Sequence, residues 1–139
     1  NLGLHPRFFV IINSMEYIAY IGLVLLSGLA IFQFLLILGV PLGKFAWGGK
    51  VAVLPVKLRV SSAVSILLYG IFAVFLISKA GIAPIIPEGI FLTVGMWVLT
   101  VYFFVGISMN AISKSKNERI VMTPVAALLA IIFLLVALH

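Results

Sequence analysis

The sequence lacks cysteine and has only three acidic residues and two histidines among its 139 residues. Without cysteine, disulfide bonds, thiolate nucleophiles and thiolate metal sites are all excluded. The histidines, His5 and His139, lie near opposite ends of the chain, and the acids are Glu16, Glu88 and Glu118. These few residues supply no catalytic triad, no paired carboxylates on one face and no His and carboxylate metal set. We therefore expect no enzymatic activity, no metal and no cofactor.

Charge of either sign is scarce. Charged residues make up 9% of the chain and hydrophobic residues 65%, with a mean hydropathy of +1.38. A soluble domain has about 25% charged and about 45–50% apolar residues, so a water-soluble fold is excluded. Nine Lys and Arg give a formal net charge of +6, but they lie between apolar runs and not in a stripe. We interpret them as topology determinants and contacts for anionic membrane lipids, with no nucleic acid as partner.

Four long apolar runs are present. A spanning helix needs about 20 mainly apolar residues, because hydrocarbon offers no partner to free backbone amides. The runs cover residues 17–40, 60–78, 88–110 and 120–138. Proline and glycine near their ends, at Pro41, Gly81, Pro87 and Pro124, are typical of helix boundaries. The sequence predicts one all-α transmembrane domain over residues 1–139, an up-down bundle of four transmembrane helices.

The basic residues indicate an orientation, since Lys and Arg in short loops resist translocation. The first connection, residues 41–59, holds four of them and the third connection, residues 111–119, holds three. Only Arg7 and Lys79 fall on the other side. We therefore expect both basic loops in the cytoplasm and both termini outside.

The residues before the first span are difficult to place. If residues 8–12 joined it, the helix would reach about 50 Å at about 1.5 Å per residue, which exceeds the bilayer. We therefore expect Asn13 and Ser14 to separate an interfacial or disordered lead-in, residues 1–14, from the span. Met15 is then a candidate native start, with the preceding residues non-native; the intact mass of the protein expressed from its own locus tests this.

The first connection is too apolar for an ordinary solvated loop. Gly48 and Gly49 lie between two apolar triplets and have the form of a tight hairpin turn, since glycine reaches positive φ without a steric clash. We expect a hairpin-like loop across the cytoplasmic end of the bundle, with Trp47 at headgroup depth. The loop is either an interfacial anchor or a binding site for a lipid headgroup, a small anion or a partner protein. The candidate binding residues are Trp47, Gly48, Gly49, Lys50, Lys57 and Arg59.

Polar and small residues within the spans have two interpretations. Several pairs of small or polar residues lie one helical turn apart on the same helix face. Such faces permit close helix packing within the bundle, against a second copy of the chain in a homo-oligomer, or against another membrane protein. These pairs are Ser61 and Ser65, Gly106 and Asn110, and Ala126 and Ala130. The competing interpretation is a polar cavity between the second and third spans. Its candidate residues are Tyr69, Trp97, Thr100, Tyr102 and Asn110.

Three segments carry a resemblance to a known group. The segments VPLGKFAWGG (40–49), LPVKLR (54–59) and SKSKNERIVMTP (113–124) together resemble small uncharacterised bacterial membrane proteins with four spans. The resemblance covers nearly the whole chain from Met15. It implies four spans in a bacterial cytoplasmic membrane and carries over no activity and no site residue. Small four-helix multidrug exporters are similar in size, but they carry a carboxylate well inside their first helix, whereas Glu16 lies at its outer end.

Two function classes remain. The first is a non-enzymatic membrane component that binds lipid or a partner protein through its cytoplasmic loops. The second is a small-molecule or ion transporter or channel that acts as an oligomer. A pathway for ions or polar solutes needs a continuous line of water-binding groups, and residues 125–138 offer none. The sequence therefore favours the binding class.

We predict that the two basic loops lie on the same, cytoplasmic side. Because the chain has no cysteine, single substitutions report accessibility without background. In intact cells, Lys50→Cys and Lys116→Cys should be protected from a membrane-impermeant maleimide, whereas Lys79→Cys should react. Labelling of positions 50 and 116 from opposite sides would contradict the four-span topology.

Overall fold

The polypeptide folds almost entirely into α-helix. The computed structural model describes residue 3 and residues 5–139, without the side chains of residues 8–13, and this part of the chain contains no strand. The α-helices are α1 (Pro6–Ile37), α2 (Val56–Lys79), α3 (Ile90–Ala111) and α4 (Lys116–Ala137). Two 3₁₀ turns, η1 (Gly43–Phe45) and η2 (Trp47–Gly49), lie between α1 and α2. All four α-helices are long and apolar enough to cross a membrane, which confirms the predicted bundle.

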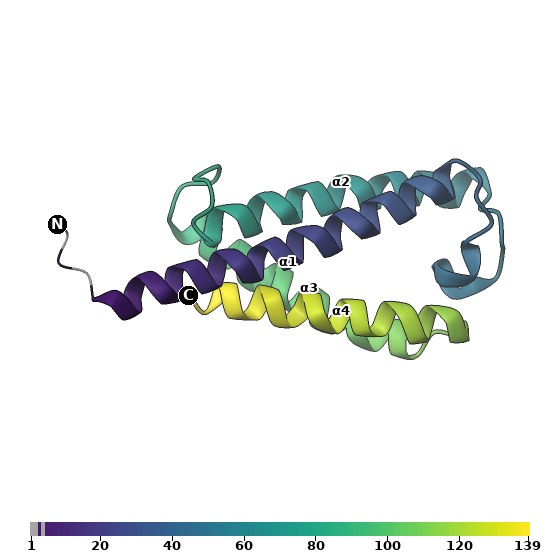
Figure 1. Cartoon of the computed structure of the whole chain (residues 1–139). Helices are drawn as coiled ribbons and strands as arrows, with labels where there is room; N and C mark the ends of the chain where they lie inside the picture. Colours follow the sequence, from purple (N-terminus) through teal and green to yellow (C-terminus); the bar gives the residue numbers. More distant parts are fainter. Residues whose placement is uncertain (1–2, 4) are drawn as a thin grey trace.

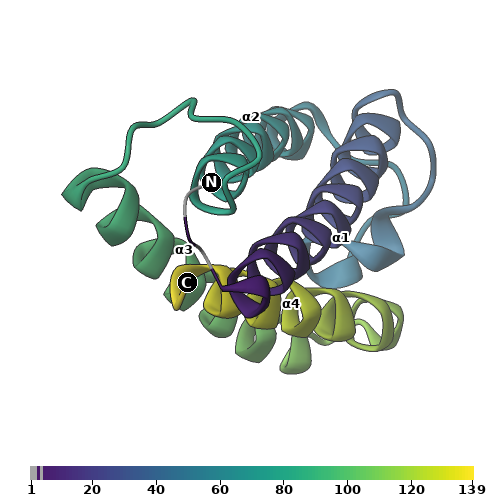
Figure 2. The same cartoon turned by 60° about the vertical axis from the view of Figure 1, so that its left-hand side comes forward.

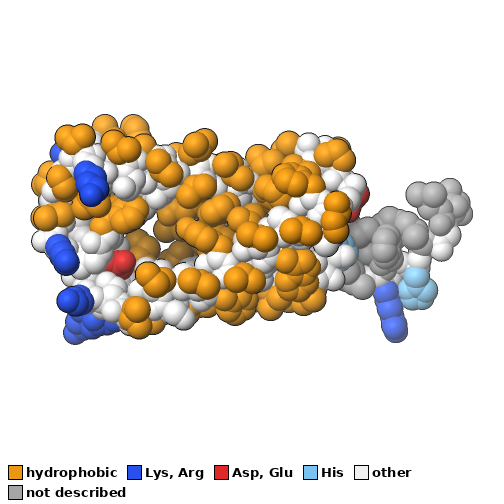
Figure 3. Space-filling model, turned by 180° about the vertical axis from the view of Figure 1, so that it is seen from behind, with side chains coloured by type: hydrophobic (Ala, Val, Ile, Leu, Met, Phe, Trp, Pro, Cys, Tyr) orange, Lys and Arg blue, Asp and Glu red, His pale blue; other side chains and the backbone are white. Residues whose placement is uncertain are grey.

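The helices alternate in direction and form two stacked pairs. α1 packs chiefly along α2, and α3 packs chiefly along α4 (Figures 1 and 2). Both termini and the connection between α2 and α3 lie at one end of the bundle. The connections from α1 to α2 and from α3 to α4 lie at the other end, as the sequence predicts. Lys and Arg side chains gather there, and we call it the basic end (Figure 3).

The start of the first helix differs from the prediction. α1 begins at Pro6 and runs without a break through Asn13 and Ser14, so the expected separation at these two residues is wrong. Proline suits the first turn because its φ is already helical, and the His5 side chain caps the turn by accepting from the Arg7 backbone N–H at 3.3 Å. Asn and Ser lower helix propensity only slightly. Residues 1, 2 and 4 of the predicted lead-in lie outside the described part of the chain.

The part of α1 whose side chains the structure describes is long and apolar enough to span a membrane. It covers Ser14–Ile37, 24 residues, which corresponds to about 36 Å at about 1.5 Å per residue. The whole helix has 32 residues and a length of about 48 Å. The whole helix is therefore longer than the hydrocarbon core of a bilayer, which is about 30 Å thick.

The tightly packed core occupies the half of the bundle away from the basic end. It is built mainly from the second halves of α2 and α4, the first half of α3 and the α1 residues Ala19 and Leu26, which come together there. Its fully buried side chains include Leu76, Leu92, Met96, Phe133 and Val136, all with 0% exposure. Large apolar side chains also cover the outer surface, as expected of helices that are surrounded by lipid (Figure 3).

Small residues allow the helices to approach closely inside the bundle. Ala126 and Ala130 are buried within the fold, so this predicted small face serves packing within one chain. On α3, a Cβ added at Gly95 would lie 2.0 Å from the Phe75 ring, which shows how tightly α2 and α3 approach at this level. Oligomerisation through the small-residue faces stays a prediction. Of the three predicted faces, the one formed by Ala126 and Ala130 packs within the chain.

We predict that Gly95→Ala lowers the stability of the bundle. The added methyl overlaps the Phe75 ring, which also packs at a tilt against Phe91 with 5.5 Å between ring centroids, so the ring must move. Overpacking of this kind costs about 1–3 kcal/mol. The thermal unfolding midpoint in detergent should fall relative to Gly28→Ala, since a Cβ at Gly28 meets no atom within 4 Å. Equal midpoints for the two variants would contradict the close approach.

Candidate functional site: a cavity at the basic end

The first connection folds back on itself across the basic end. The Gly43 N–H donates to the Ala52 carbonyl at 2.9 Å and closes the loop. Gly48 and Gly49 have φ values of 80° and 69°, which confirms the predicted turn through left-handed glycines. The residues beside the turn form η1 and η2, so the path resembles a hairpin but has no paired extended strands.

The apolar character of this loop has a structural cause. Ala46 and Leu54 of the loop are buried against Leu36 at the end of α1, and together they form a small second core. Arg59 ties the same region together, since its guanidinium donates to the Leu54 carbonyl at 2.7 Å and to the Ile37 carbonyl at 3.3 Å. The loop is therefore a packed cap on the helix ends.

The cap is docked on the start of α4. The Ser115 hydroxyl donates to the Lys44 carbonyl, and the Gly48 N–H donates to Glu118 Oε2 at 2.9 Å. Gly49 permits this approach, because a Cβ there would lie 2.5 Å from the Ser115 Cβ. Segments about 70 residues apart in the chain thus meet at the basic end.

Glu118 reaches the loop through a modified capping arrangement. Ser115 is the N-cap of α4, and its hydroxyl accepts from the Glu118 N–H at 3.3 Å. In a capping box the Glu side chain returns to the N-cap backbone N–H. Here the Ser113 hydroxyl accepts from that N–H instead, at 3.2 Å. The Glu118 carboxylate is thereby free to bind Gly48 and the Ser113 hydroxyl, the latter at 3.2 Å.

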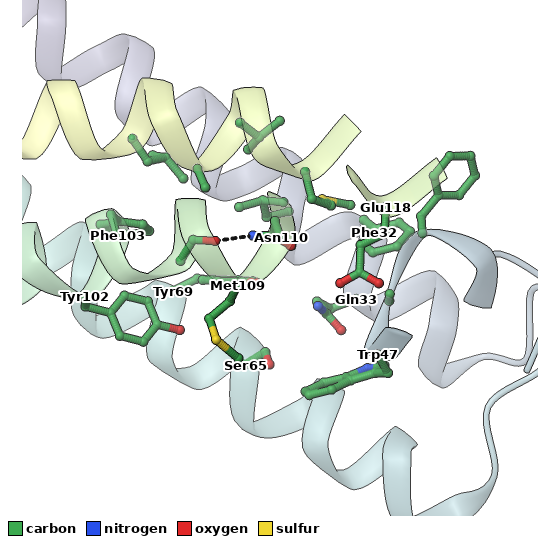
Figure 4. Close-up of a pocket in the computed structure, with 18 of the residues that line it drawn as sticks. Phe32, Gln33, Trp47, Ser65, Tyr69, Tyr102, Phe103, Met109, Asn110 and Glu118 are labelled. Atoms are coloured by element: carbon green, nitrogen blue, oxygen red, sulfur yellow. Dashed lines mark hydrogen bonds between the residues drawn. The ribbon is translucent and has the colours of Figure 1, made fainter. Parts of the chain in front are cut away.

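Beneath the cap lies a cavity of about 430 Å³. All four α-helices and the loop contribute to it (Figure 4). Its deeper wall is apolar and includes Leu29, Phe103 and Leu129. Aromatic side chains line it at several levels, namely Phe32, Phe45, Trp47, Tyr69, Tyr102 and Phe103. The cavity therefore offers mainly apolar and aromatic surface, as ligand sites do.

Trp47 closes part of the cavity from the loop side. Its indole N–H donates to the Ser62 hydroxyl at 3.2 Å, and Ser62 is fully buried on α2. This bond fixes the ring at the mouth of the cavity, where Trp47 is still 40% exposed. Trp47 thus joins the loop to α2 as Glu118 joins it to α4.

The cavity is open at its side. α2 supplies only Ser65 and Tyr69 to the lining, so the wall between α2 and α3 is incomplete. Tyr102 and Met109 on α3 line the cavity and are nevertheless 50% and 62% exposed. On the face in Figure 3, a hollow opens between rows of apolar side chains near the basic end. The opening faces the direction in which lipid surrounds the bundle.

The polar groups of the cavity are concentrated toward the basic end. Gln33, which is 8% exposed, points into the space between Glu118 and Trp47, and its Oε1 has no hydrogen-bond partner among the described residues (Figure 4). Asn110 donates from its amide to the Gly106 carbonyl at 2.9 Å, and Ser65 donates to the Ser61 carbonyl at 3.1 Å. A buried amide oxygen without a donor is costly, by about 1–3 kcal/mol.

Three of the five predicted cavity residues line this cavity and two do not. Tyr69, Tyr102 and Asn110 belong to its wall. Thr100 is buried elsewhere and donates to the Met96 carbonyl at 2.8 Å, while Trp97 is 39% exposed and lies outside the lining. The prediction that Thr100 and Trp97 line a cavity together with Tyr102 is therefore wrong for these two residues.

The predicted loop residues divide into three groups. Trp47 lines the cavity, and Gly48 and Gly49 dock the loop on α4. Arg59 holds backbone carbonyls at the end of α1. Lys50 and Lys57 are exposed at the basic end, outside the cavity lining. Binding of a lipid or partner by these side chains stays a prediction.

Residues that sequence reasoning did not assign to a site complete the cavity. Gln33 and Glu118 are the two that change its chemistry most, since one brings an unpaired amide oxygen and the other a carboxylate. Gln33 interrupts a long apolar run, which was an available signal. Among the described residues, no group of three or more His, Cys, Asp or Glu can hold a metal ion.

Comparison with known proteins adds no relative. The sequence matches no protein-family model, no curated protein and no solved structure. The resemblance to small bacterial four-span proteins accordingly stays a prediction from its motifs.

We predict that Gly49→Ala undocks the loop from α4 more than Gly48→Ala does. Both glycines have left-handed φ, so alanine is strained at either position. Only at Gly49 does the added Cβ also meet Ser115, whereas at Gly48 it meets nothing within 4 Å. The additional overlap should cost about 1–3 kcal/mol. Trypsin cleavage after Lys44 and Lys50 should therefore be faster in Gly49→Ala; equal rates in the two variants would contradict the docking.

Proposed function

We propose that the protein is a non-enzymatic membrane component that binds a membrane amphiphile in the cavity at its basic end. The observation that carries this proposal is a laterally open, largely apolar cavity of about 430 Å³ whose polar groups lie at one end. Sites for small ligands occupy about 300–1,000 Å³ and combine apolar walls with a few placed polar groups. This cavity has both properties.

The distribution of polarity supports an amphiphile. The deep part of the cavity, near Leu29, Phe103 and Leu129, suits an apolar chain. The end beside the cap, near Gln33 and Glu118, suits a polar headgroup. A ligand of this kind would supply the hydrogen-bond donor that Gln33 Oε1 lacks within the described part of the chain.

The side opening supports entry from the bilayer. The wall between α2 and α3 is incomplete at the level of Tyr69, Tyr102 and Met109. A lipid or lipid-like molecule in the surrounding hydrocarbon meets this opening directly, without passing the loop that caps the helix ends. An amphiphile that partitions into the membrane is therefore the ligand class that we propose.

The packing of the opposite half favours binding over transport. Leu76, Leu92, Met96 and Phe133 fill that half with fully buried apolar side chains. A pathway for ions or polar solutes needs water-binding groups along its length. The polar lining is confined to one half of the bundle, which supports a binding site rather than a channel.

We propose the same location and orientation that the charge pattern predicts, namely a bacterial cytoplasmic membrane with the basic end in the cytoplasm. The positive-inside rule supports this orientation, because seven of the nine Lys and Arg lie at that end or in the turns next to it. Lys50 and Lys57 are exposed there and suit anionic headgroups at the surface.

We predict that Gly106→Phe blocks ligand binding while the fold is preserved. Gly106 lines the cavity, and a Cβ added there meets no atom within 4 Å, so the ring has free volume to occupy. Wild-type protein released from nanodiscs in native mass spectrometry should retain an amphiphile. The variant should lose at least about tenfold in occupancy, which corresponds to about 1.4 kcal/mol.

Gly28→Phe on α1 is the matched control for this variant. A Cβ at Gly28 also meets nothing within 4 Å, but Gly28 is not among the residues that line the cavity. Gly28→Phe should retain the ligand as wild type does. Equal retention by Gly106→Phe, with an unchanged circular dichroism spectrum, would overturn the proposed function.

A further inference from the structure

Glu118 is the acidic residue of the basic end. The other two acids, Glu16 and Glu88, lie in the first half of α1 and in the connection before α3, toward the opposite end. Glu118 is half-buried, lines the cavity and forms no ion pair with any described Lys or Arg. Such isolation is unexpected for a carboxylate whose neighbours in sequence include Lys114, Lys116 and Arg119.

The neighbouring cations are held away from this carboxylate. Arg119 donates from Nη1 to the Ser113 carbonyl at 2.7 Å, and Lys114 and Lys116 are exposed to the outside. The two hydrogen bonds that Glu118 accepts, from Gly48 and Ser113, both fall on Oε2. Glu118 Oε1 accepts no hydrogen bond within the described part of the chain. The carboxylate is thus held in place, and one oxygen and the negative charge are left for a ligand.

The surroundings of this oxygen suit a cation with N–H donors. Glu118, Phe32, Gln33 and Trp47 converge on the same end of the cavity (Figure 4). Aromatic faces attract a cation within about 6 Å, and a desolvated cation gains most from this contact. Gln33 Oε1 is a second acceptor without a donor. A primary ammonium can donate to both oxygens, whereas a quaternary ammonium has no N–H to donate.

We infer that the amphiphile bound in the cavity carries a primary ammonium group, which binds between Glu118, Gln33 and the aromatic side chains. This inference rests on the proposed function and names the chemistry of its ligand. An aminophospholipid such as phosphatidylethanolamine and a free long-chain amine share this chemistry. The cavity binds the ammonium in both cases, and its apolar part holds the chain.

Binding of single-chain probes tests the ammonium. In a Trp97→Phe background, Trp47 at the cavity mouth reports binding by fluorescence. Dodecylammonium should bind more tightly than dodecyltrimethylammonium or dodecanol. Glu118→Gln keeps an oxygen that accepts from Gly48 and Ser113 but removes the charge. It should weaken dodecylammonium binding by about 10- to 100-fold, the range expected for a hydrogen bond to a charged group.

Glu88→Gln is the matched control, since it removes the same charge at the other end of the bundle. Dodecylammonium binding by Glu88→Gln should equal that of the parent protein. If Glu118→Gln binds dodecylammonium as tightly as Glu88→Gln does, the ammonium site is overturned. The proposed function still stands after that result if Gly106→Phe blocks dodecanol binding. If Gly106→Phe binds every probe as the parent protein does, both the proposed function and the ammonium site are overturned.

An experiment in nanodiscs distinguishes an aminophospholipid from a free long-chain amine as the ligand. The protein is reconstituted in equal amounts of phosphatidylethanolamine, phosphatidylcholine and phosphatidylglycerol, and the retained lipid is identified by native mass spectrometry. Selective retention of phosphatidylethanolamine that is lost in Glu118→Gln supports a membrane lipid as ligand. Unselective lipid retention together with Glu118-dependent dodecylammonium binding supports a free amine. Unselective retention without such binding overturns the inference.

Discussion

Hydrocarbon offers no hydrogen-bond partner, so every polar group inside a spanning helix must find one within the protein. The backbone meets this requirement by forming four α-helices. The side chains of Ser65, Ser78, Thr100 and Asn110 meet it in one common way, since each donates to the backbone carbonyl four residues earlier in its own helix. A side chain that donates within its own helix needs no hydrogen-bond partner on a neighbouring helix and no cavity.

Gln33 departs from this pattern, because its amide oxygen is left for the ligand that we propose in the cavity. Its amide is nearly buried, and the Oε1 atom has no donor among the described residues. Thr123 Oγ1 is also buried without a hydrogen-bond partner in the described part of the chain, but Thr123 does not line the cavity. The convergence of Gln33 with Glu118, whose carboxylate is diverted from its own N-cap by Ser113, creates a polar end in an otherwise apolar space. Because buried polar groups need hydrogen-bond partners, the Oε1 atom of Gln33 indicates where a polar group of a ligand is expected.

Hydropathy and charge were sufficient to predict the architecture from the sequence. The predicted spans agree with α2, α3 and α4 to within about four residues, since the bilayer requires long apolar runs that are easily recognised. The start of α1 was missed because Asn13 and Ser14 are only weak helix breakers, and Pro6 with His5 supplies a good helix start further upstream. The course of the first loop was predicted at Gly48 and Gly49, where positive φ has a clear sequence signal.

The cavity was only partly predictable, because helices that are apolar all round do not reveal which face points inward. On α3, residues four and seven positions apart share a face, so Tyr102, Gly106 and Met109 line the cavity together. Thr100 lies one turn after Met96 and is buried with it, while Trp97 falls on the outer side. Glu118 was assigned only to a loop end, since its contact with Gly48 spans 70 positions and depends on how the cap folds.

The cavity occupies one half of the bundle, and this asymmetry bears on how the proposed amphiphile would be bound. Its polar end lies beside the cap at the basic end, and its apolar part lies toward the packed core around Phe133 and Leu76. A headgroup that moved toward the other leaflet would lose Glu118 and Gln33 and meet the packed apolar core around Leu76 and Phe133. That loss opposes passage across the membrane, because a charged group at the centre of a bilayer costs at least about 2.5–3.5 kcal/mol. The arrangement therefore favours a protein that holds an amphiphile from one leaflet over one that carries it across.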